Sequence, residues 1–244
     1  VEFATNLYNQ AIELGAEVKF EKAINYEITN SIKKVITTSN EYECKSIIIA
    51  TGADKRKLGV EREEELVGKG VSYCATCDGM FFKNKDVAVV GGGDAALGEA
   101  EYLSDICNKV YLIHRRDEFR GEESTVELLK ERKNIEFIFN SNVTSLNSNG
   151  KLESIEVTDN VGNKQLIKVY GLFVAVGRIP ENQNFAKLIN LDNSGYIIAL
   201  EDCNTNVSGI FVAGDNRTKE VRQLVTATSD GAIAANEAIK YINN

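Results

Sequence analysis

The sequence predicts an α/β fold in which buried parallel strands end at turns that face a ligand. The first observation behind this prediction is a set of three apolar runs, each leading directly into a glycine. Continuous apolar runs are typical of strands covered on both faces. Ligands of open parallel sheets bind beyond the carboxyl ends of such strands. The three runs are Ser46–Ala50 before Thr51-Gly52, Tyr170–Val176 before Gly177, and Gly209–Ala213 before Gly214-Asp215.

The second observation is a complete strand-turn-helix-strand unit. We expect a strand at Val87–Val90, a helix at Ala95–Ser104 and a second strand at Lys109–Ile113. The turn between the first strand and the helix, Gly91-Gly92-Gly93-Asp94-Ala95-Ala96, fits the pattern G-x-G-x-x-A.

In that pattern the first glycine allows a tight turn and the second lets the backbone approach a pyrophosphate. The N-terminus of the helix then supplies amide donors and the positive end of its dipole. We therefore expect Gly91, Gly93, Asp94 and Ala95 to bind a dinucleotide.

The remaining elements follow from local periodicity and from helix-ending residues such as Gly15. We expect helices at residues 6–14, 122–132 and 225–242. We expect further strands at residues 16–20, 32–38, 41–45, 135–139, 152–158 and 165–169.

Composition and charge exclude several function classes. The net charge of −8 argues against a broad basic surface for nucleic acid. No apolar run reaches the roughly 20 residues of a membrane helix, and the opening residues lack the pattern of a signal peptide. Of five cysteines, only Cys74 and Cys77 are close together, so we expect Cys44, Cys107 and Cys203 to be reduced thiols. These features predict a cytoplasmic protein without a membrane or nucleic-acid partner.

The residues that follow the second strand of the unit distinguish between dinucleotides. A site for NAD places Asp or Glu about 20 residues after the glycines, to bind the ribose 2′-hydroxyl. This chain has His114-Arg115-Arg116 there, and Arg120 one helical turn later. Positive groups at this position suit a 2′-phosphate, so we expect NADPH.

The segment Cys74-Ala75-Thr76-Cys77-Asp78-Gly79 contains the candidate redox centre. A zinc site needs a second pair of ligands, which the sequence lacks, so we expect no metal. A thioredoxin-like domain is disfavoured because the chain has no Trp and its single proline, Pro180, lies far away. The remaining interpretation is a redox dithiol next to a nucleotide-binding unit, with Asp78 as the candidate proton carrier.

Together these motifs resemble the thioredoxin reductase family, and they occur in the family's order across nearly the whole chain. The resemblance rests on the dithiol segment, the glycine turn and four further segments. These are His114–Arg120, Phe173–Gly177, Gly209–Asp215, and Arg222–Ala227 running into Asp230-Gly231-Ala232.

The resemblance implies two Rossmann-like, three-layer domains, one inserted into the other. Residues 56–177 would form the NADPH domain with the dithiol, and residues 1–55 and 178–244 the FAD domain. The implied activity is NADPH-dependent, FAD-mediated reduction of the disulfide of thioredoxin or a thioredoxin-like protein by a cytoplasmic homodimer.

The resemblance also implies a role for each site residue. Cys77 would lie nearest the flavin, Cys74 would attack the partner's disulfide, and Asp78 would act as acid and base. Contacts to FAD or the dinucleotide would come from Thr51, Gly52, Gly177, Gly214, Asp215, Arg222, Gln223 and Leu224.

The sequence also departs from the family, and two alternatives stay open. The chain opens after the strand and glycine turn that hold the FAD pyrophosphate in the family, so we expect an incomplete FAD domain. Ala95 stands where Ser or Thr is usual, and Gly98 replaces the first of two glutamates, leaving Glu99. The alternatives are the flavoprotein subunit of an alkyl hydroperoxide reductase, which prefers NADH, and a catalytically incomplete NADP-binding fragment.

Overall fold

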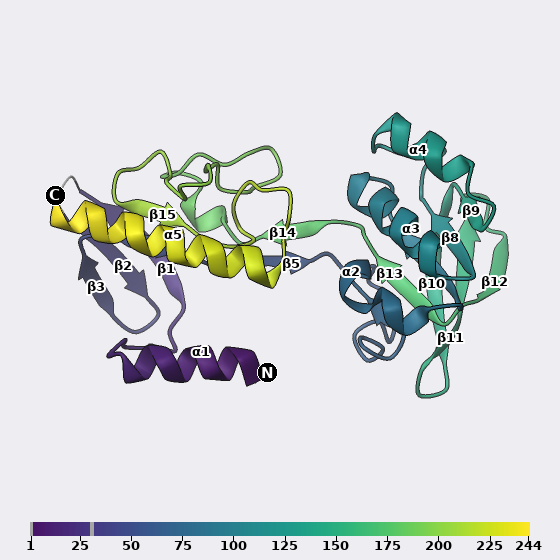
Figure 1. Cartoon of the computed structure of the whole chain (residues 1–244), viewed down its shortest axis with the longest axis horizontal. Coiled ribbons are helices and arrows are strands. Elements are labelled where there is room, and N and C mark those ends of the chain that lie inside the picture. The colour runs from purple at the N-terminus through teal and green to yellow at the C-terminus, as the bar shows by residue number, and fades with distance from the viewer. Residues whose placement is uncertain (1, 30–31) are drawn as a thin grey trace. The chain divides into compact units, whose positions relative to one another are not determined.

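The computed structural model of the chain describes residues 2–29 and 32–244 (Figure 1). The contacts within the chain divide it into two compact units. Unit 1 comprises the residues up to Ala53 and those from Pro180 onward, and unit 2 comprises Asp54–Ile179. The chain passes between the units as β5 (Ala53–Lys55) and β14 (Arg178–Pro180), which pair with each other. The sequence analysis placed the domain boundaries after residues 55 and 177, and their assignment to FAD and NADPH stays a prediction here.

Unit 2 is built on a five-stranded sheet in the order β6-β13-β7-β8-β9, and every neighbouring pair in it is parallel. Its strands are β6 (Val71–Ser72), β13 (Gly171–Val174), β7 (Asp86–Val90), β8 (Lys109–Ile113) and β9 (Ile135–Ile138). The helices of this unit are α2 (Ala75–Asp78), η1 (Gly79–Phe82), α3 (Asp94–Ile106) and α4 (Glu123–Lys130). An antiparallel sheet completes the unit, formed by β10 (Ser141–Ser148), β11 (Leu152–Asp159) and β12 (Lys164–Lys168).

The alternation of side chains along β7 explains why this unit has three layers. Val87 and Val89 pack with Leu97 and Leu103 of α3 on one face of the parallel sheet. Ala88 and Val90 point to the opposite face and belong to the cluster that contains the antiparallel sheet. A strand whose two faces are both covered must be apolar at every position, which is why its sequence reads as a continuous run.

Unit 1 combines a parallel pair with an antiparallel sheet and two long helices. β4 (Ile47–Ile49) and β15 (Ile210–Val212) pair in parallel. The antiparallel sheet has the order β1-β2-β3. Its strands and the helices of the unit are β1 (Ala23–Ile28), β2 (Lys33–Thr37), β3 (Glu41–Cys44), α1 (Glu2–Glu13), η2 (Gln183–Phe185) and α5 (Leu224–Asn243).

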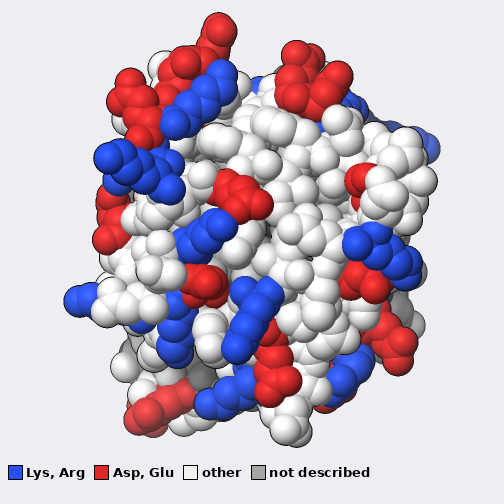
Figure 2. All heavy atoms as spheres, turned by 90° about the vertical axis from the view of Figure 1, so that its right-hand side faces the viewer, with Lys and Arg blue, Asp and Glu red and all other residues white. Residues whose placement is uncertain are grey.

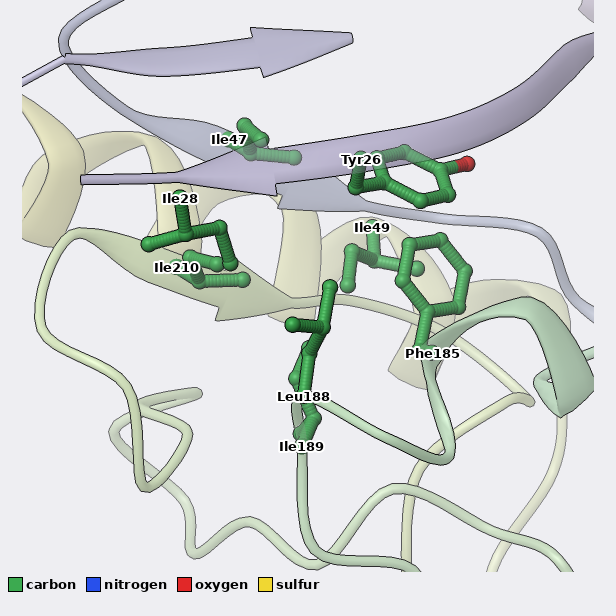
Figure 3. A pocket seen from close by; sticks show the side chains of 8 residues that line it. All are labelled: Tyr26, Ile28, Ile47, Ile49, Phe185, Leu188, Ile189 and Ile210. Atoms are coloured by element: carbon green, nitrogen blue, oxygen red, sulfur yellow. The ribbon is translucent and has the colours of Figure 1, made fainter. Parts of the chain in front are cut away.

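The core of unit 1 is a dense apolar cluster between the antiparallel sheet and the parallel pair. Ile47, Ile49 and Ile210 meet Leu188 and Ile189 there, and Figure 3 shows these side chains pointing toward one another. The rings of Tyr26 and Phe185 lie beside them with centroids 4.4 Å apart. The hollow that these residues line has no space for a water molecule, so it is packed core and not a ligand site.

Most predicted elements are present, but one strand prediction is wrong, and the sequence did not predict five strands: β1, β5, β6, β10 and β14. Residues 16–20 alternate like a strand, yet they form none, and Phe20 is 90% exposed. Alternation of polar and apolar residues shows only that a strand here could bury one of its faces. A strand also needs hydrogen bonds to a neighbouring strand. β1 and β10 were missed because their polar and charged residues hide the alternation that burial on a single face produces.

On the face drawn in Figure 2, Lys and Arg side chains lie among Asp and Glu side chains, beside a broad uncharged area. Mixed charges of this kind create little net potential at a distance. Among the helices described here, none is both long enough and apolar enough to cross a membrane.

The position of β8 inside the parallel sheet, between β7 and β9, gives a direct test of the unit 2 core. Leu112 is fully buried in the cluster between the parallel sheet and α3. Leu112→Ala is expected to lower the free energy of unfolding by roughly 2–5 kcal/mol, through lost burial and a residual cavity. Leu166→Ala, on the outer strand β12 with 67% exposure, should change it by less than about 0.5 kcal/mol. Urea unfolding followed by circular dichroism measures both, and equal losses would contradict this core assignment.

Candidate active site

The register of the parallel sheet brings the predicted groups of unit 2 to one edge. Ser72 at the end of β6 pairs with Phe173, Val174 of β13 with Val90, and Val90 with Ile113 at the end of β8. The dithiol segment, the glycine turn and His114 each follow the end of one of these strands. They therefore share the carboxyl edge of the sheet, where ligands of parallel sheets bind.

Cys74 and Cys77 form a disulfide across the short helix α2, with their Cα atoms 5.3 Å apart. Cys74 is the N-cap residue of this helix and is half-buried, whereas Cys77 is exposed. A second protein can therefore reach at least one sulfur of the pair.

The dithiol is attached to the helix that opens at the glycine turn. A methyl group at Gly79 would lie 2.9 Å from Tyr102 and 3.1 Å from Leu103, so the backbone after α2 packs directly against α3. The backbone N–H of Ala75 lies 3.5 Å from Oε1 of Glu99, also on α3. Burial raises the pKa of Glu99, and its Oε2 is buried without a hydrogen-bond partner among the described residues.

Asp78 occupies a defined place beside the dithiol. The hydroxyl of Ser72 donates a hydrogen bond of 2.7 Å to Asp78 Oδ2, and the N–H of Cys74 donates to the same hydroxyl at 3.1 Å. Asp78 and Ser72 also line a cavity of about 390 Å³. The other residues of its wall include Lys69, Lys85, Lys151, Phe82 and Tyr170. In the sequence Asp78 is marked by its position directly after the dithiol, whereas no motif marks Ser72.

The glycine turn has the shape that an approaching phosphate requires. A Cβ atom at Gly91 would lie 2.4 Å from the carbonyl oxygen of Ala175, so only glycine fits between the strands. A Cβ at Gly93 would meet nothing within 4 Å, which leaves open space before the first turn of α3. Gly93 is the N-cap of α3, and Asp94 and Ala95 lie exposed in its first turn.

His114 and the arginine segment close around this turn. The imidazole of His114 covers Gly92 so closely that a Cβ there would lie 2.1 Å from the ring. The N–H of Arg120 donates to the carbonyl oxygen of Gly92 at 2.6 Å, and the N–H of Glu122 donates to Asp94 Oδ1 at 2.7 Å. The predicted dinucleotide residues of unit 2 are thus brought together by backbone contacts.

The charges around the turn favour an anion. Arg115, Arg116 and Arg120 are exposed, while His114 is 4% exposed and its Nε2 has no hydrogen-bond partner among the described residues. Burial, followed by the three nearby guanidinium groups, lowers the pKa of His114 and keeps the imidazole neutral near pH 7. The three exposed guanidinium groups beside the turn suit a phosphate-bearing ligand.

Two further predicted turns meet in unit 1. β4 and β15 pair with Ile49 opposite Val212, so Thr51-Gly52 and Gly214-Asp215 follow neighbouring strand ends. The amide of Asn216 donates to Thr51 Oγ1 at 3.1 Å and joins the two turns. Asn182 supports them by donating to the carbonyl oxygens of Asn216 and Gly195 at 2.7 Å and 2.9 Å. Asn182 and Asn216 are fully buried, and sequence reasoning did not find either.

A buried ionic cluster lies behind the Gly214 turn. Asp230 on α5 accepts hydrogen bonds from the Gly214 N–H at 2.9 Å, from Arg217 at 2.8 Å and from Lys219 at 2.7 Å. Burial alone would disfavour the charged carboxylate, but these three donors outweigh it and hold the pKa of Asp230 well below its usual range. The hydrogen bonds of Asp230 thus connect the Gly214 turn to α5.

The segment before α5 contains the last predicted residues of unit 1. Arg222 stacks on the ring of Tyr196, 4.1 Å from the centroid. Its Nε is buried without a hydrogen-bond partner among the described residues, which leaves one donor for a ligand. Gln223 is the N-cap of α5 and forms a capping box with Thr226, and Leu224 is 61% exposed. In unit 2, Gly177 is exposed after β13, and its carbonyl oxygen accepts the N–H of Arg56 at 3.0 Å.

The other cysteines are separate from the dithiol. Cys44, Cys107 and Cys203 are free thiols, as predicted. Burial raises the pKa of Cys107 to about 11 and that of Cys44 and Cys203 above the usual value. Within residues 2–29 and 32–244, no group of three or more His, Cys, Asp or Glu side chains is arranged to hold a metal ion.

The chain combines a disulfide with a glycine turn of the kind that binds dinucleotides. This combination defines the class of protein. The model of the pyridine nucleotide-disulphide oxidoreductase family matches residues 4–231, and the chain belongs to this family. Among curated relatives, a thioredoxin reductase of Peptoclostridium acidaminophilum is 44% identical over 241 residues. The alignment covers 96% of this chain and 76% of the relative. A thioredoxin reductase of Listeria innocua is 40% identical over 99% of this chain and 76% of its own length.

Solved structures give the same result. The thioredoxin reductase from Streptococcus pyogenes is 36% identical, with a TM-score of 0.93 over 99% of this chain and 80% of the solved chain. The enzyme from Giardia duodenalis is 33% identical, with a TM-score of 0.94 over 100% and 81%. The chain therefore has the two-domain α/β fold predicted from its sequence.

Asp230 gives a test of the cluster behind the Gly214 turn. Asp230→Asn is expected to destabilise the protein by roughly 3–5 kcal/mol at pH 7, because Arg217 and Lys219 lose the buried counter-charge that they share. Because the folded-state pKa of Asp230 lies below the unfolded value of about 3.9, this contribution is present above that value. It is lost as the pH falls through the folded-state pKa.

Urea unfolding from pH 3 to pH 8 measures the free energy of unfolding of Asp230→Asn and of the unmodified protein. The difference between the two values should narrow below about pH 4. Glu201→Gln is the matched control. Glu201 also contacts Arg217, at 3.4 Å, but its side chain is 89% exposed, so its loss should cost less than about 1 kcal/mol. An equal loss in both variants would contradict the assignment of the charge balance to Asp230.

Proposed function

We propose that this chain catalyses the NADPH-dependent, FAD-mediated reduction of thioredoxin through the Cys74–Cys77 dithiol. The observation that carries the proposal is the attachment of an accessible disulfide to α3, the helix that opens at the glycine turn. The relatives at 40–44% identity are thioredoxin reductases, which fixes the choice of partner within the family.

The residues of unit 2 fit NADPH. The open space at Gly93 and the N-terminus of α3 would receive the pyrophosphate, and the ring of His114 packs over Gly92 in the same turn. Arg115, Arg116 and Arg120 would hold the 2′-phosphate, since all three are exposed and their charges act on His114 beside the turn. Asp94 would act indirectly, because its carboxylate anchors the loop that carries Arg120.

The residues of unit 1 fit FAD. Gly52 has a φ of +70° and open space around its missing Cβ, and Thr51 is tied to the Gly214 turn through Asn216. Arg222, with its unused buried Nε, would orient the isoalloxazine ring together with Gln223. When bound, FAD supplies the two-electron transfer between the nicotinamide and the disulfide.

The chemistry of the chain's own residues is thiol–disulfide exchange. In the reduced protein the Cys74 thiolate attacks one sulfur of the partner's disulfide, and the partner's other sulfur leaves as a thiolate. Cys77 then attacks Cys74 Sγ, which releases the second thiolate of the partner and restores the Cys74–Cys77 disulfide. The two cysteines lose two electrons and the partner gains them.

Asp78 would move the protons of this exchange. Each attack needs a thiolate, so the attacking thiol must lose a proton, and each sulfur that leaves as a thiolate then takes one up to become a thiol. Asp78 lies in the hydrogen-bond network of Cys74 and faces the cavity of unit 2, so it would pass protons between the sulfurs and water.

The alternative as an alkyl hydroperoxide reductase subunit is not favoured. That enzyme prefers NADH, whereas three arginines flank the turn here. We further infer a homodimer in the cytoplasm. The exposed Val225 and Ile239 of α5 suit a protein contact, and three unpaired cysteines suit a reducing compartment.

Dinucleotide preference tests the role of the arginines. Arg115→Ala and Arg116→Ala should each weaken NADPH binding roughly 10- to 100-fold, the cost of one charge-assisted bond. NADH binding should change little, because NADH lacks the 2′-phosphate. Calorimetric titration of both dinucleotides measures this, with Arg132→Ala as control, since Arg132 pairs with Asp105 on α3. Equal losses for NADPH and NADH would overturn the assignment.

The order of the two cysteines has its own test. A thioredoxin with one active-site cysteine, activated as the mixed disulfide with 2-nitro-5-thiobenzoate, gives a coloured thiolate when attacked. Cys77→Ser should release one equivalent and retain the thioredoxin covalently at Cys74, because no second thiol can resolve the adduct. Cys74→Ser should form the adduct at least roughly tenfold more slowly, and Cys44→Ser serves as control. Faster adduct formation by Cys74→Ser would reverse the assigned order.

A further inference from the structure

We propose that Ser72 is a positioning residue that holds Asp78 against the dithiol in both of its protonation states. This inference rests on the proposed acid and base role of Asp78. Ser72 ends β6 and is 4% exposed, and nothing in its own sequence context marks it as functional. Its hydroxyl contacts Asp78 Oδ2 at 2.7 Å, the Cys74 N–H at 3.1 Å and the Cys74 carbonyl oxygen at 3.4 Å.

These three contacts give the hydroxyl two alternative arrangements. A serine hydroxyl has one proton to donate and two lone pairs to accept. While Asp78 is ionised, Ser72 donates to Asp78 Oδ2 and accepts the Cys74 N–H. When Asp78 carries a proton, Asp78 donates to the Ser72 oxygen, and the hydroxyl proton turns to the carbonyl oxygen of Cys74. Neither arrangement requires movement of a heavy atom.

This adaptability matters because an acid and base must occupy both states in each cycle. A partner that can only donate, such as lysine, would favour the carboxylate, and one that can only accept would favour the acid. The hydroxyl of Ser72 supports both states, so Asp78 stays in place while its proton is lost and regained.

The proton also has a route to solvent. Ser72 and Asp78 both line the cavity of about 390 Å³, which is large enough for several water molecules. The titratable groups on its wall are Lys69, Lys85, Lys151 and Tyr170. On α3, Glu99 faces the N–H of Ala75. Tyr73, next to Ser72, donates its hydroxyl proton to Glu63 Oε1 at 2.6 Å.

A purely structural role for Ser72 makes a different prediction. By accepting the Cys74 N–H, Ser72 could act only as a local cap for the dithiol turn. Its loss would then disturb Cys74 whether or not Asp78 is present. A double-mutant cycle separates the two roles, because residues that act through each other are not additive.

The experiment is the reduction of the Cys74–Cys77 disulfide by dithiothreitol in the full chain, followed by quenching with iodoacetamide and mass spectrometry. A dithiothreitol thiolate attacks one protein sulfur, and the other leaves and takes up a proton. The second dithiothreitol thiol then closes the ring and releases the first sulfur. The protein variants are Ser72→Ala, Asp78→Asn, the double variant and Ser72→Thr. Ser141→Ala is the matched control, since Ser141 is also 4% exposed and its hydroxyl donates to the carbonyl oxygen of Phe139.

The expected result is that Asp78→Asn and Ser72→Ala each slow reduction by about 100-fold, at the lower end of the range for loss of a general acid. The double variant should be no slower than Asp78→Asn, Ser72→Thr should recover most of the rate, and Ser141→Ala should match the unmodified protein. Additive losses in the double variant would overturn the proposal in favour of a local cap. A slow Asp78→Asn with an unaffected Ser72→Ala would overturn it while leaving the proposed function intact. An unaffected Asp78→Asn would instead contradict the proposed role of Asp78, and the Ser72 proposal with it.

Discussion

The parallel register of β6, β13, β7 and β8 is the constraint on which the chemistry of unit 2 depends. Ser72, Val174, Val90 and Ile113 end their strands side by side, so the segments that follow must emerge at the same edge of the sheet. β6 has two residues, and its pairing with β13 brings Cys74 to this edge. A slip of one residue would turn Ser72 to the other face of the sheet and separate its hydroxyl from Asp78.

Helix α3 converts this shared edge into a connection between two chemical sites. Its N-terminus faces the glycine turn, and its body contacts the dithiol segment through Glu99, Tyr102 and Leu103. Gly98 replaces a glutamate that is usual in the family. The helix tolerates this change, because Gly98 is exposed and a Cβ there would meet nothing within 4 Å. Glu99, which the chain keeps, is the residue that reaches the N–H of Ala75. The departure at Ala95 is likewise on an exposed position of the first turn.

The sequence predicts features that depend on residues close together in the chain. It misses features that depend on contacts between residues far apart in the chain. Apolar runs that end at glycine, the spacing of Cys74 and Cys77, and the arginines after Ile113 are all readable along the chain, and they place most strands and motifs. Residues 16–20 show the limit, since alternation alone provides no pairing partner. The contacts of Ser72, Asn182, Asn216 and Asp230 join residues that a sequence presents as unrelated polar positions. Of these, only Asp230 lies within a recognised motif, and there its contact with the Gly214 turn is invisible.

The contact with Asp230 also determines how Gly214 can contribute to ligand binding. The N–H of Gly214 points back to the carboxylate of Asp230, so this group is not available to a ligand. The glycine therefore contributes shape, since its φ of +92° is a conformation that other residues adopt only with strain. Arg217 and Lys219 hold the carboxylate of Asp230 in place behind the turn. The turn is thus formed before any cofactor arrives, so binding need not supply the free energy of ordering it.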